Sequence, residues 1–299
     1  MFNLAAIRYR NVMAAKGGPV AQLETVDGAV LGHRQFVANA TLAPGLGDTG
    51  ERAVVFSAAH GSGTAASPMV ARFMAISEAL ERWAHWQLHR GDRAWRFGFD
   101  ADPSSNGMAA FPGVLARQAR SRAVFEAAER FNLMHWWEGR LAAREVAAPW
   151  PGVRAAVICS DAPGVTVIVF RRSAEESVAY GHAAAGDFRS ACWRAAIEME
   201  RHALAVARFA ERHPGGRRRA HALKVSIVER RSLFFAAPEG YELFRERLCR
   251  APRGGRCRPE VLFDGPLPGP WTRYADVWRV VYAPPSDAFI SPTENYFLW

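Results

Sequence analysis

Small apolar residues recur at helical spacing in three stretches of this chain, and each stretch ends in a glutamate. Side chains four positions apart lie on one face of an α-helix, and an acid three positions further on extends that face. The repeated pattern therefore predicts three helices of the same design, each with a stripe of small residues that ends in a carboxylate. The pattern Ala-x-x-x-Ala-x-x-Glu occurs at Ala71, Ala75 and Glu78, at Ala119, Ala123 and Glu126, and at Ala191, Ala195 and Glu198.

Hydrophobic periodicity and chain breakers predict a mixed fold, α/β or α+β, in which repeated sheet-and-helix units converge on one site. Strands are predicted on both sides of the turn at residues 161–164, and again from Ala275 to Tyr282. One domain over residues 46–299, after an N-terminal lead of residues 1–45, accounts for these elements better than two domains do. Helices are predicted over residues 67–90, 113–147, 187–212 and 240–249.

Two of the three helices are preceded by the same kind of segment. Ala53 to Phe56 predicts a strand, residues 61–63 a glycine loop, and Ser67-Pro68 a helix start with Ser as the N-cap. Residues 181–187 supply a second glycine loop with Asp187 as the cap. The chain is rich in alanine, which inflates chance identities, but an internal repeat is indicated. Five residues, Gly61, Ala65, Ala71, Ala75 and Glu78, recur 120 positions later as Gly181, Ala185, Ala191, Ala195 and Glu198.

Two of the acidic stripes extend to the same motif, Glu-x-x-Glu-Arg. Glutamate and arginine four positions apart are ordinary surface partners, which stabilise a helix by about 0.2–0.5 kcal/mol. Tryptophans close to both motifs, among them Trp83 and Trp136, argue against a solvated helix face. The motif residues are Glu78, Glu81 and Arg82 in the first stripe, and Glu126, Glu129 and Arg130 in the second.

Carboxylates gathered from several helices would repel one another unless a bound divalent cation or a raised pKa relieved the repulsion. Magnesium suits an all-oxygen site better than zinc does, and it readily shares phosphate oxygens. Arg82 and Arg130 would hold such oxygens through their planar guanidinium groups. The residues therefore predict a site for magnesium and a nucleoside triphosphate, with the loop around Asn106 as a further contact. Neither common glycine-rich nucleotide motif is present, so ATP would bind by an unusual route.

Taken in this order, the motifs resemble those of the YcaO-domain family, whose members use ATP to modify peptide backbones. The resemblance extends from about residue 50 to residue 205. Its three elements are residues 61–82, residues 105–137 and residues 181–198. Each element is weak by itself, and the order of the three is what makes the resemblance specific.

The resemblance implies roles for individual residues. In the family, the acids of these motifs hold magnesium ions that bridge the ATP phosphates, while Arg82, Asn106 and Arg130 would contact the nucleotide. Two positions depart from the family pattern, because Met74 stands in place of a common Ser and His202 in place of a common Gln. A nucleotide contact is implied at His202 by its position. The implied metal ligands are Glu78, Glu81, Glu126, Glu129 and Glu198.

The activity that the resemblance implies is ATP-dependent cyclodehydration of a ribosomally made precursor peptide. A Cys, Ser or Thr side chain attacks the preceding backbone carbonyl, whose oxygen is phosphorylated, and loss of phosphate leaves a thiazoline or oxazoline. External sulfide in place of the side chain gives a thioamide, and an amine gives an amidine. A scaffold without catalysis is a further alternative, favoured by Met74 and His202. The residues do not choose among these outcomes.

The C-terminus is the expected source of a general base, because family members often carry a Pro-x-Pro-x-Pro tail there. This chain lacks that repeat and ends in Trp299, whose carboxylate is the base that the resemblance suggests. Docking of the aromatic tail on its own domain or on a partner is the simpler interpretation.

Composition limits the class of protein further. A chain of 299 residues with 49% hydrophobic residues can bury a large core, and it contains no apolar run near 18 residues long. The four cysteines show no Cys-x-x-Cys spacing, and the first 16 residues lack the layout of a signal peptide. We therefore expect a cytoplasmic protein with no membrane segment.

Charge and chain length indicate the partners. The net charge is +9, and arginines gather from Arg217 to Arg258, which we interpret as a surface for an acidic leader peptide or partner. Nucleic acid and a plain solvated loop are the alternatives, but no nucleic-acid module surrounds the stretch and no nucleic-acid partner is expected. The chain shows no separate leader-recognition domain, so a partner protein is expected to bind the leader of the precursor peptide. A flavin dehydrogenase and self-association into a homo-oligomer are left open.

Histidines offer weaker candidates. Glu81, His85 and His89 share one helical stripe that could bind zinc, but polar packing is the favoured interpretation because no His-Glu-x-x-His motif is present. His60 and His182 lie in the two glycine segments and are better placed to contact a ligand.

Overall fold

The computed structural model describes residues 4–47, 54–173, 176–215, 225–253 and 257–298. The chain forms two compact units, each with its own antiparallel sheets and helices, so the expected mixed α/β class is confirmed. The division into a lead of residues 1–45 and a domain of residues 46–299 stays a prediction. Unit 1 comprises Met1–Gly50, Ala58–Ala127 and Glu260–Ala283, and unit 2 comprises Glu51–Ser57, Ala128–Pro259 and Pro284–Trp299.

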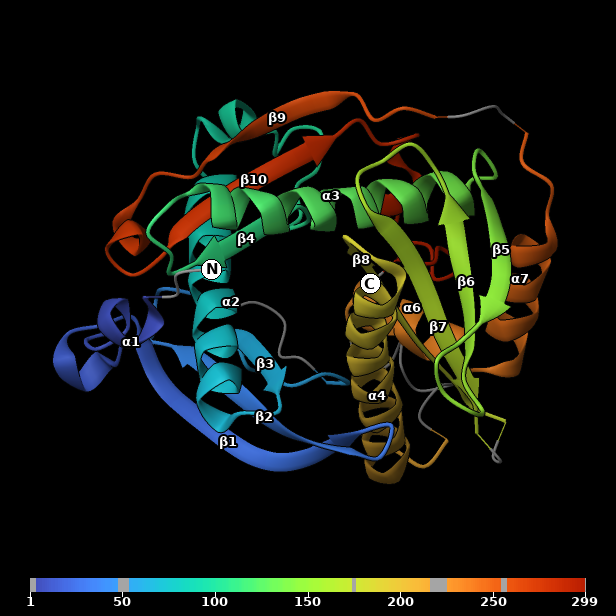
Figure 1. Cartoon of the computed structure of the whole chain (residues 1–299), viewed down its shortest axis with the longest axis horizontal. Coiled ribbons are helices and arrows are strands. Elements are labelled where there is room, and N and C mark those ends of the chain that lie inside the picture. Colours follow the sequence, from blue (N-terminus) through green and yellow to red (C-terminus); the bar gives the residue numbers. More distant parts are fainter. Residues whose placement is uncertain (1–3, 48–53, 174–175, 216–224, 254–256, 299) are drawn as a thin grey trace. The chain divides into compact units, whose positions relative to one another are not determined.

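Unit 1 contains two three-stranded antiparallel sheets. The first has the strand order β1-β2-β3, and helix α2 packs across it (Figure 1). The second has the order β4-β10-β9. The bounds are α1 Ala5–Arg8, β1 Val20–Val30, β2 His33–Leu42, β3 Gly61–Ala65, α2 Pro68–His89, β4 Met108–Phe111, β9 Val261–Pro266 and β10 Asp276–Tyr282.

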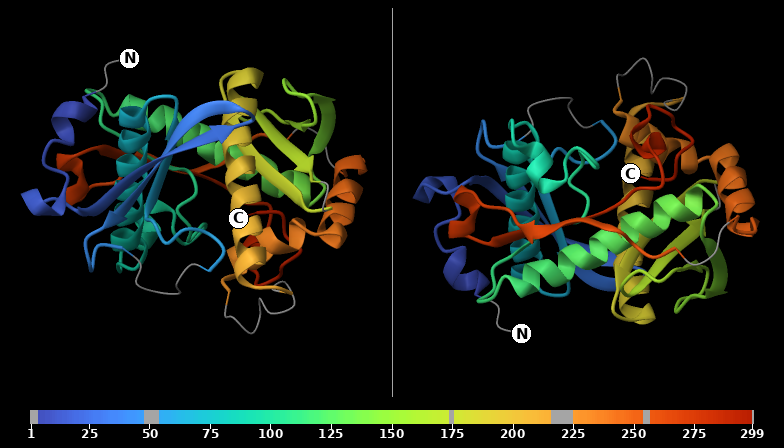
Figure 2. Two further views of the ribbon diagram at one scale, coloured as in Figure 1. Left: turned by 90° about the horizontal axis from the view of Figure 1, so that it is seen from below. Right: turned by 90° about the horizontal axis from the view of Figure 1, so that it is seen from above.

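Unit 2 is built on a four-stranded antiparallel meander with the order β5-β6-β7-β8. Helix α4 lies against this sheet, as Figure 2 shows with the helix in gold and the sheet in yellow-green. Helix α3, Arg117–Trp137, begins in unit 1 and ends in unit 2. The other bounds are β5 Ala142–Ala147, β6 Arg154–Cys159, β7 Val165–Arg172, β8 Val178–Ala185, α4 Phe188–Arg212, α6 Ile227–Phe235 and α7 Pro238–Cys249.

The stripes of small residues let a strand backbone pack directly on each helix. A Cβ atom added to Gly61 on β3 would lie 2.1 Å from the carbonyl oxygen of Ala75 on α2. A Cβ atom added to Gly181 on β8 would lie 1.9 Å from the carbonyl oxygen of Ala195 on α4. Both alanines are fully buried. The same contact therefore occurs twice, 120 positions apart, and the predicted internal repeat is confirmed.

Two predictions of local structure before the helices are wrong. Residues 61–63 and 181–185 are not glycine loops, because they belong to strands β3 and β8. The predicted strand at residues 54–56 is a bend, and Ala53 lies outside the described residues. The N–H groups of residues 54, 55 and 56 donate to one carboxylate oxygen of Glu229, at 2.9, 2.8 and 3.1 Å. A buried acid therefore satisfies these donors in place of a neighbouring strand.

The predicted helix over residues 113–147 is too long. Helix α3 ends at Trp137 because Gly139 turns the chain at a positive φ of 79°, and residues 142–147 form strand β5. By contrast, α2, α4 and α7 end within two residues of the predicted bounds, and the β6–β7 hairpin and β10 are confirmed. None of the helices in the described part of the chain is long and apolar enough to cross a membrane.

Candidate functional site

Unit 1 brings the first acidic motif next to strand β3. Glu78 on α2 accepts a hydrogen bond from the backbone N–H of Ser62, at 3.0 Å. The guanidinium group of Arg82 lies 3.7 Å from the other carboxylate oxygen of Glu78, and it donates a hydrogen bond to the hydroxyl of Ser105. Backbone and side-chain donors therefore fix the direction of the first acid.

Electrostatic repulsion shows that the acids of unit 1 are close together. Burial, and next the negative charge of Glu126 on α3, raise the pKa of Glu81 well above its usual value. Glu78 adds to the same effect, and a hydrogen bond from the Ala110 backbone opposes it. Glu78, Glu81 and Glu126 therefore lie close together in unit 1.

Asn106 lies in a hydrogen-bonded turn. Its side-chain amide donates to the carboxylate of Asp102 at 3.2 Å. The backbone N–H and hydroxyl of Ser104 donate to the same carboxylate, at 2.9 and 2.6 Å. Strand β4, not a helix, follows the turn. Asn106 is consequently held in place next to Ser105, the residue to which Arg82 donates.

Unit 1 also contains a buried cation that was not predicted from the sequence, Arg279 on β10. Its side chain is fully buried, with one N–H donating to the carbonyl of Asp102 and the guanidinium carbon 3.6 Å from the centroid of the Phe99 ring. Nε and Nη1 have no hydrogen-bond partner among the described residues. Burial lowers the pKa of Arg279 to about 10, with the charges of Asp102 and Glu126 acting in the opposite direction. The sequence signal was an arginine at the centre of an apolar strand.

Unit 2 gathers the remaining acids around His182 on β8. Nδ1 of His182 donates a hydrogen bond to Oε1 of Glu129 at 2.8 Å, and lies 3.6 Å from Oε2 of Glu198. The backbone N–H of Ala184 donates to Glu129 at 3.3 Å, and that of His182 to Glu198 at 3.4 Å. One nitrogen or oxygen from each of Glu129, His182 and Glu198 lies within 4.8 Å of the other two. We call these three residues the Glu-His-Glu group.

Exposure and charge differ across the Glu-His-Glu group. Glu129 is 8% exposed, whereas the Glu198 side chain is 48% exposed, so the group opens to solvent on the side of Glu198. Burial raises the pKa of Glu129, but the hydrogen bond and charge of His182 outweigh burial and lower it. Nε of Arg130 lies 4.0 Å from Glu129, which places the predicted phosphate ligand of the second motif beside this acid.

No protein-family profile matches the sequence, and no curated protein matches it. Among solved structures, YcaO from Methanopyrus kandleri bound with AMPPCP and Mg²⁺ superposes with a TM-score of 0.56 and 14% sequence identity. The match covers 98% of this chain and 92% of that chain. The chain has a YcaO-like fold. At this sequence identity, the structural similarity establishes the fold alone and not the function.

His202 is a core residue of unit 2. It is 2% exposed, its Nδ1 accepts a hydrogen bond from the backbone of Tyr180 at 3.0 Å, and its Nε2 donates to the carbonyl of Ser232 at 3.1 Å. Burial lowers the pKa of His202 to about 4. A nucleotide contact at His202 stays a prediction, and it would require one of these two hydrogen bonds to break.

We expect His202 to make folding stability depend on pH. Its pKa is about 4 when folded and 6.5 when exposed, so between these values the unfolded chain binds a proton that the folded chain does not. Stability is therefore lost as the pH falls from 6.5 to 4, by a total of about 3 kcal/mol from this group. Urea denaturation at several pH values measures how the free energy of unfolding changes with pH. Between pH 4 and 6.5 this change should be smaller for His202→Gln than for the unchanged protein. His33→Gln, at an exposed position of β2, is the control, and equal changes for all three proteins would contradict the prediction.

The predicted base, Trp299, lies outside the described residues. The segment before it docks on unit 2, as the simpler interpretation of an aromatic tail predicts. Phe297 is fully buried, with its ring centroid 6.4 Å from that of His182. The buried guanidinium group of Arg231 binds the tail by donating to four backbone carbonyls, those of Phe289, Ser291, Thr293 and Leu298.

The weaker histidine candidates, His85 and His89, pack against protein. The rings of His85 and His89 stack with centroids 4.4 Å apart, and Nε2 of His85 lies 2.9 Å from the carbonyl of Pro103. Both contacts agree with polar packing. Residues 217–219 of the basic stretch lie outside the described residues.

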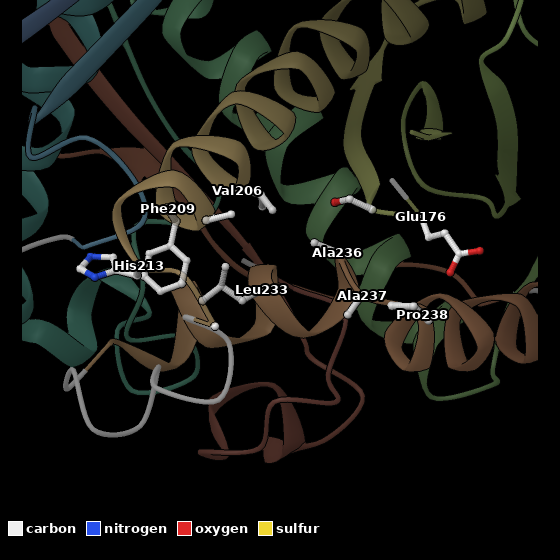
Figure 3. A pocket seen from close by; sticks show the side chains of 11 residues that line it. Glu176, Val206, Phe209, His213, Leu233, Ala236, Ala237 and Pro238 are labelled. Atoms are coloured by element: carbon white, nitrogen blue, oxygen red, sulfur yellow. The ribbon is translucent and has the colours of Figure 1, made fainter. Parts of the chain in front are cut away.

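Unit 2 also has an apolar pocket of about 250 Å³. Val206 and Phe209 of α4 and Leu233 of α6 face it, while Glu176 and His213 lie at its ends (Figure 3). No predicted site residue lines it. The pocket lacks the converging acids of the two motif groups, and it therefore has no part in the site proposed below.

Proposed function

We propose that this chain is an ATP-dependent cyclodehydratase that acts on a ribosomally made precursor peptide. The observation that carries the proposal is the pair of acidic groups, one in each unit, each with an arginine of a Glu-x-x-Glu-Arg motif beside it. Carboxylates with neighbouring guanidinium groups suit a magnesium nucleotide, because the ion and the arginines neutralise different phosphate oxygens. Support also comes from the Methanopyrus kandleri protein of the same fold, which was bound with AMPPCP and Mg²⁺.

The all-carboxylate donor set of unit 1 fits magnesium. Burial and then repulsion by the neighbouring acids raise the pKa of Glu81, and a divalent cation would relieve that repulsion. We propose that all five acids are metal ligands. When bound, magnesium would offset negative charge on the transferred phosphoryl group. The proposed ligands are Glu78, Glu81 and Glu126 in unit 1, and Glu129 and Glu198 in unit 2.

The remaining residues would bind and orient the nucleotide and the peptide. Arg82 and Arg130 would hold phosphate oxygens, and Asn106 would donate to the nucleotide from its fixed turn. The peptide nucleophile forms a bond to the preceding carbonyl carbon and gives up its proton to the proposed base, the carboxylate of Trp299. The carbonyl oxygen takes the γ-phosphoryl group, which releases ADP, and then leaves as phosphate with the amide proton. The balance is peptide and ATP to azoline peptide, ADP and phosphate.

The partners follow from this chemistry. A leader-binding partner protein would deliver the precursor peptide, and a flavin dehydrogenase could then oxidise the azoline product. Mass spectrometry of peptide incubated with the protein, ATP and Mg²⁺, with and without the partner, tests the proposal. We expect a peptide lighter by one water for each ring, and ADP in equal amount. An unchanged peptide with the partner present would overturn the proposal.

Replacing single acids should distinguish the proposed metal ligands from ordinary surface carboxylates by the rate of ADP formation. Glu78→Gln keeps an acceptor for the Ser62 N–H but removes the charge, and we expect ADP formation to fall at least about 100-fold. The control is Glu24→Gln, an exposed position on β1, where we expect no change. Equal rates in the two variants would contradict the assignment of Glu78 as a ligand.

Two alternative functions predict different results in the same assays. A non-catalytic scaffold in a modification complex, which Met74 and His202 favour, would bind no ATP in a calorimetric titration. A thioamide-forming enzyme supplied with sulfide would give a heavier peptide, because sulfur replaces oxygen, and an amidine-forming one would need an amine.

A further inference from the structure

We infer that the Glu-His-Glu group of Glu129, His182 and Glu198 binds a divalent transition-metal ion in preference to magnesium. The inference deepens the proposed function, and it rests on that proposal for the use of Glu129 and Glu198 as metal ligands. What is new is the imidazole of His182 as a third ligand, and the class of ion that it selects.

Three separate elements bring the ligands together. Glu129 comes from α3, His182 from β8 and Glu198 from α4, and their ligand atoms lie within 4.8 Å of one another. Nδ1 of His182 is 2.8 Å from Glu129 and 3.6 Å from Glu198, so it faces both carboxylates. Because the three ligand atoms are already this close, small shifts of their side chains would suffice to place all three around one cation.

Backbone donors orient both carboxylates. The N–H of Ala184 holds Glu129, and the N–H of His182 holds Glu198, in the manner of outer contacts that support metal ligands in other proteins. The imidazole is 3% exposed, so its ring has little freedom to turn away. Glu198 remains 48% exposed, which leaves a route for an ion from solvent.

The type of ligand decides the type of ion. Magnesium takes oxygen ligands almost exclusively, whereas Mn²⁺, Fe²⁺ and Zn²⁺ accept an imidazole nitrogen beside carboxylates. A group of two carboxylates and one histidine with an open side therefore favours a transition metal. Arg130, 4.0 Å from Glu129, adds a positive charge beside the group, which the second carboxylate helps to offset.

The internal repeat supplies the comparison within the chain. In unit 1, Glu78 accepts a hydrogen bond from the backbone N–H of Ser62. In unit 2, Glu198 accepts one from the backbone N–H of His182. Donor and acceptor in unit 2 each lie 120 positions after their counterparts in unit 1. The equivalent position therefore has a hydroxyl in one unit and an imidazole in the other. The substitution His182→Ser gives the second group the residue of the first and should remove the preference for a transition metal.

The test uses the purified full chain with Mn²⁺ as the probe, without nucleotide or peptide. Electron paramagnetic resonance measures Mn²⁺ binding, and competition by Mg²⁺ gives the ratio of the two affinities. We expect a bound Mn²⁺ whose spin-echo spectrum shows coupling to a nitrogen nucleus, and an affinity at least about tenfold above that for Mg²⁺. In His182→Ser the nitrogen coupling should vanish and the affinity ratio should fall about tenfold.

Glu198→Gln is the second variant, because this exposed side chain can change without disturbing the core. It should also lose the nitrogen-coupled Mn²⁺. Glu200→Gln, on the same helix but paired with Arg171, should keep it. Absent nitrogen coupling in the unchanged protein, or coupling that persists in His182→Ser, would overturn the inference. Failure of peptide modification would leave these results unaffected, since neither ATP nor peptide is present.

Discussion

Replacing Gly61 or Gly181 by alanine should destabilise the folded chain strongly. The added Cβ atom would lie 2.1 Å from the Ala75 carbonyl oxygen in the first case and 1.9 Å from that of Ala195 in the second. Backbone atoms surround each position, so no side chain can move aside, and the strand must separate from its helix. We expect each substitution to cost at least about 3 kcal/mol, measured as the loss in free energy of unfolding in urea.

The control for both variants is Gly91→Ala, after the end of α2. The nearest heavy atom to an added Cβ there is the Leu88 carbonyl oxygen at 3.6 Å, an ordinary contact distance. We expect a change within about 0.5 kcal/mol. A similar loss for Gly91→Ala, or little loss for Gly61→Ala, would show that the close strand–helix contacts do not determine stability.

The same contacts explain why the repeat carries chemistry as well as packing. Gly61 precedes Ser62, and Gly181 precedes His182, the residues whose backbone N–H groups donate to Glu78 and Glu198. Close approach of strand and helix therefore sets the distance between each donor and its acid. A larger residue at either glycine would move the donor away, so stability and the direction of the acid depend on one backbone contact.

The three helices could be predicted because their periodicity and starts are local signals. Small residues four apart, Pro68 in the first turn and Asp187 as a cap that accepts from the Ser190 N–H all lie within a few residues of one another. Strand β8 had no comparable signal. All eight of its residues are buried, so it shows no alternation, and its alanines and glycine have low strand propensity.

The β1–β2 hairpin was missed for the opposite reason. Most of β1 is exposed on both faces, which removes the alternation that marks a half-buried strand. Its turn at Leu31 and Gly32 uses positive φ angles of 47° and 80°, a conformation that Leu rarely adopts and that the sequence does not announce.

The motifs in the sequence predicted the acids of the site, but not the side chains that contact or surround those acids. Glu78, Glu81 and Glu126 share unit 1, and Glu129 and Glu198 share unit 2, because helical spacing fixes which face each acid occupies. The place of His182 between two acids depends on β8 pairing with β7 and on α3, which are far apart in sequence. Arg279 and its carbonyl partner are separated by 177 residues, beyond the reach of any local pattern.

Arg231→Met should destabilise unit 2 strongly and release the C-terminal tail. The guanidinium group is 3% exposed, and burial lowers its pKa, but four tail carbonyls accept its hydrogen bonds at 2.7–3.2 Å. Methionine fills similar space and donates to none of them. Because the carbonyls would remain buried without donors, or the tail would leave the surface, we expect a loss of about 3–5 kcal/mol in the free energy of unfolding.

The neighbouring arginine provides the matched control. Arg230 pairs with Glu294 of the same tail at 3.2 Å, but both side chains are partly exposed, so Arg230→Met should cost less than about 1 kcal/mol. Limited proteolysis should then cut the tail of Arg231→Met well before that of Arg230→Met. Equal stability and equal cleavage in the two variants would show that Arg231 does not hold the tail. Since Trp299 follows Leu298 directly, release of the tail should also remove the proposed base, and the azoline product should be lost while Mn²⁺ binding remains.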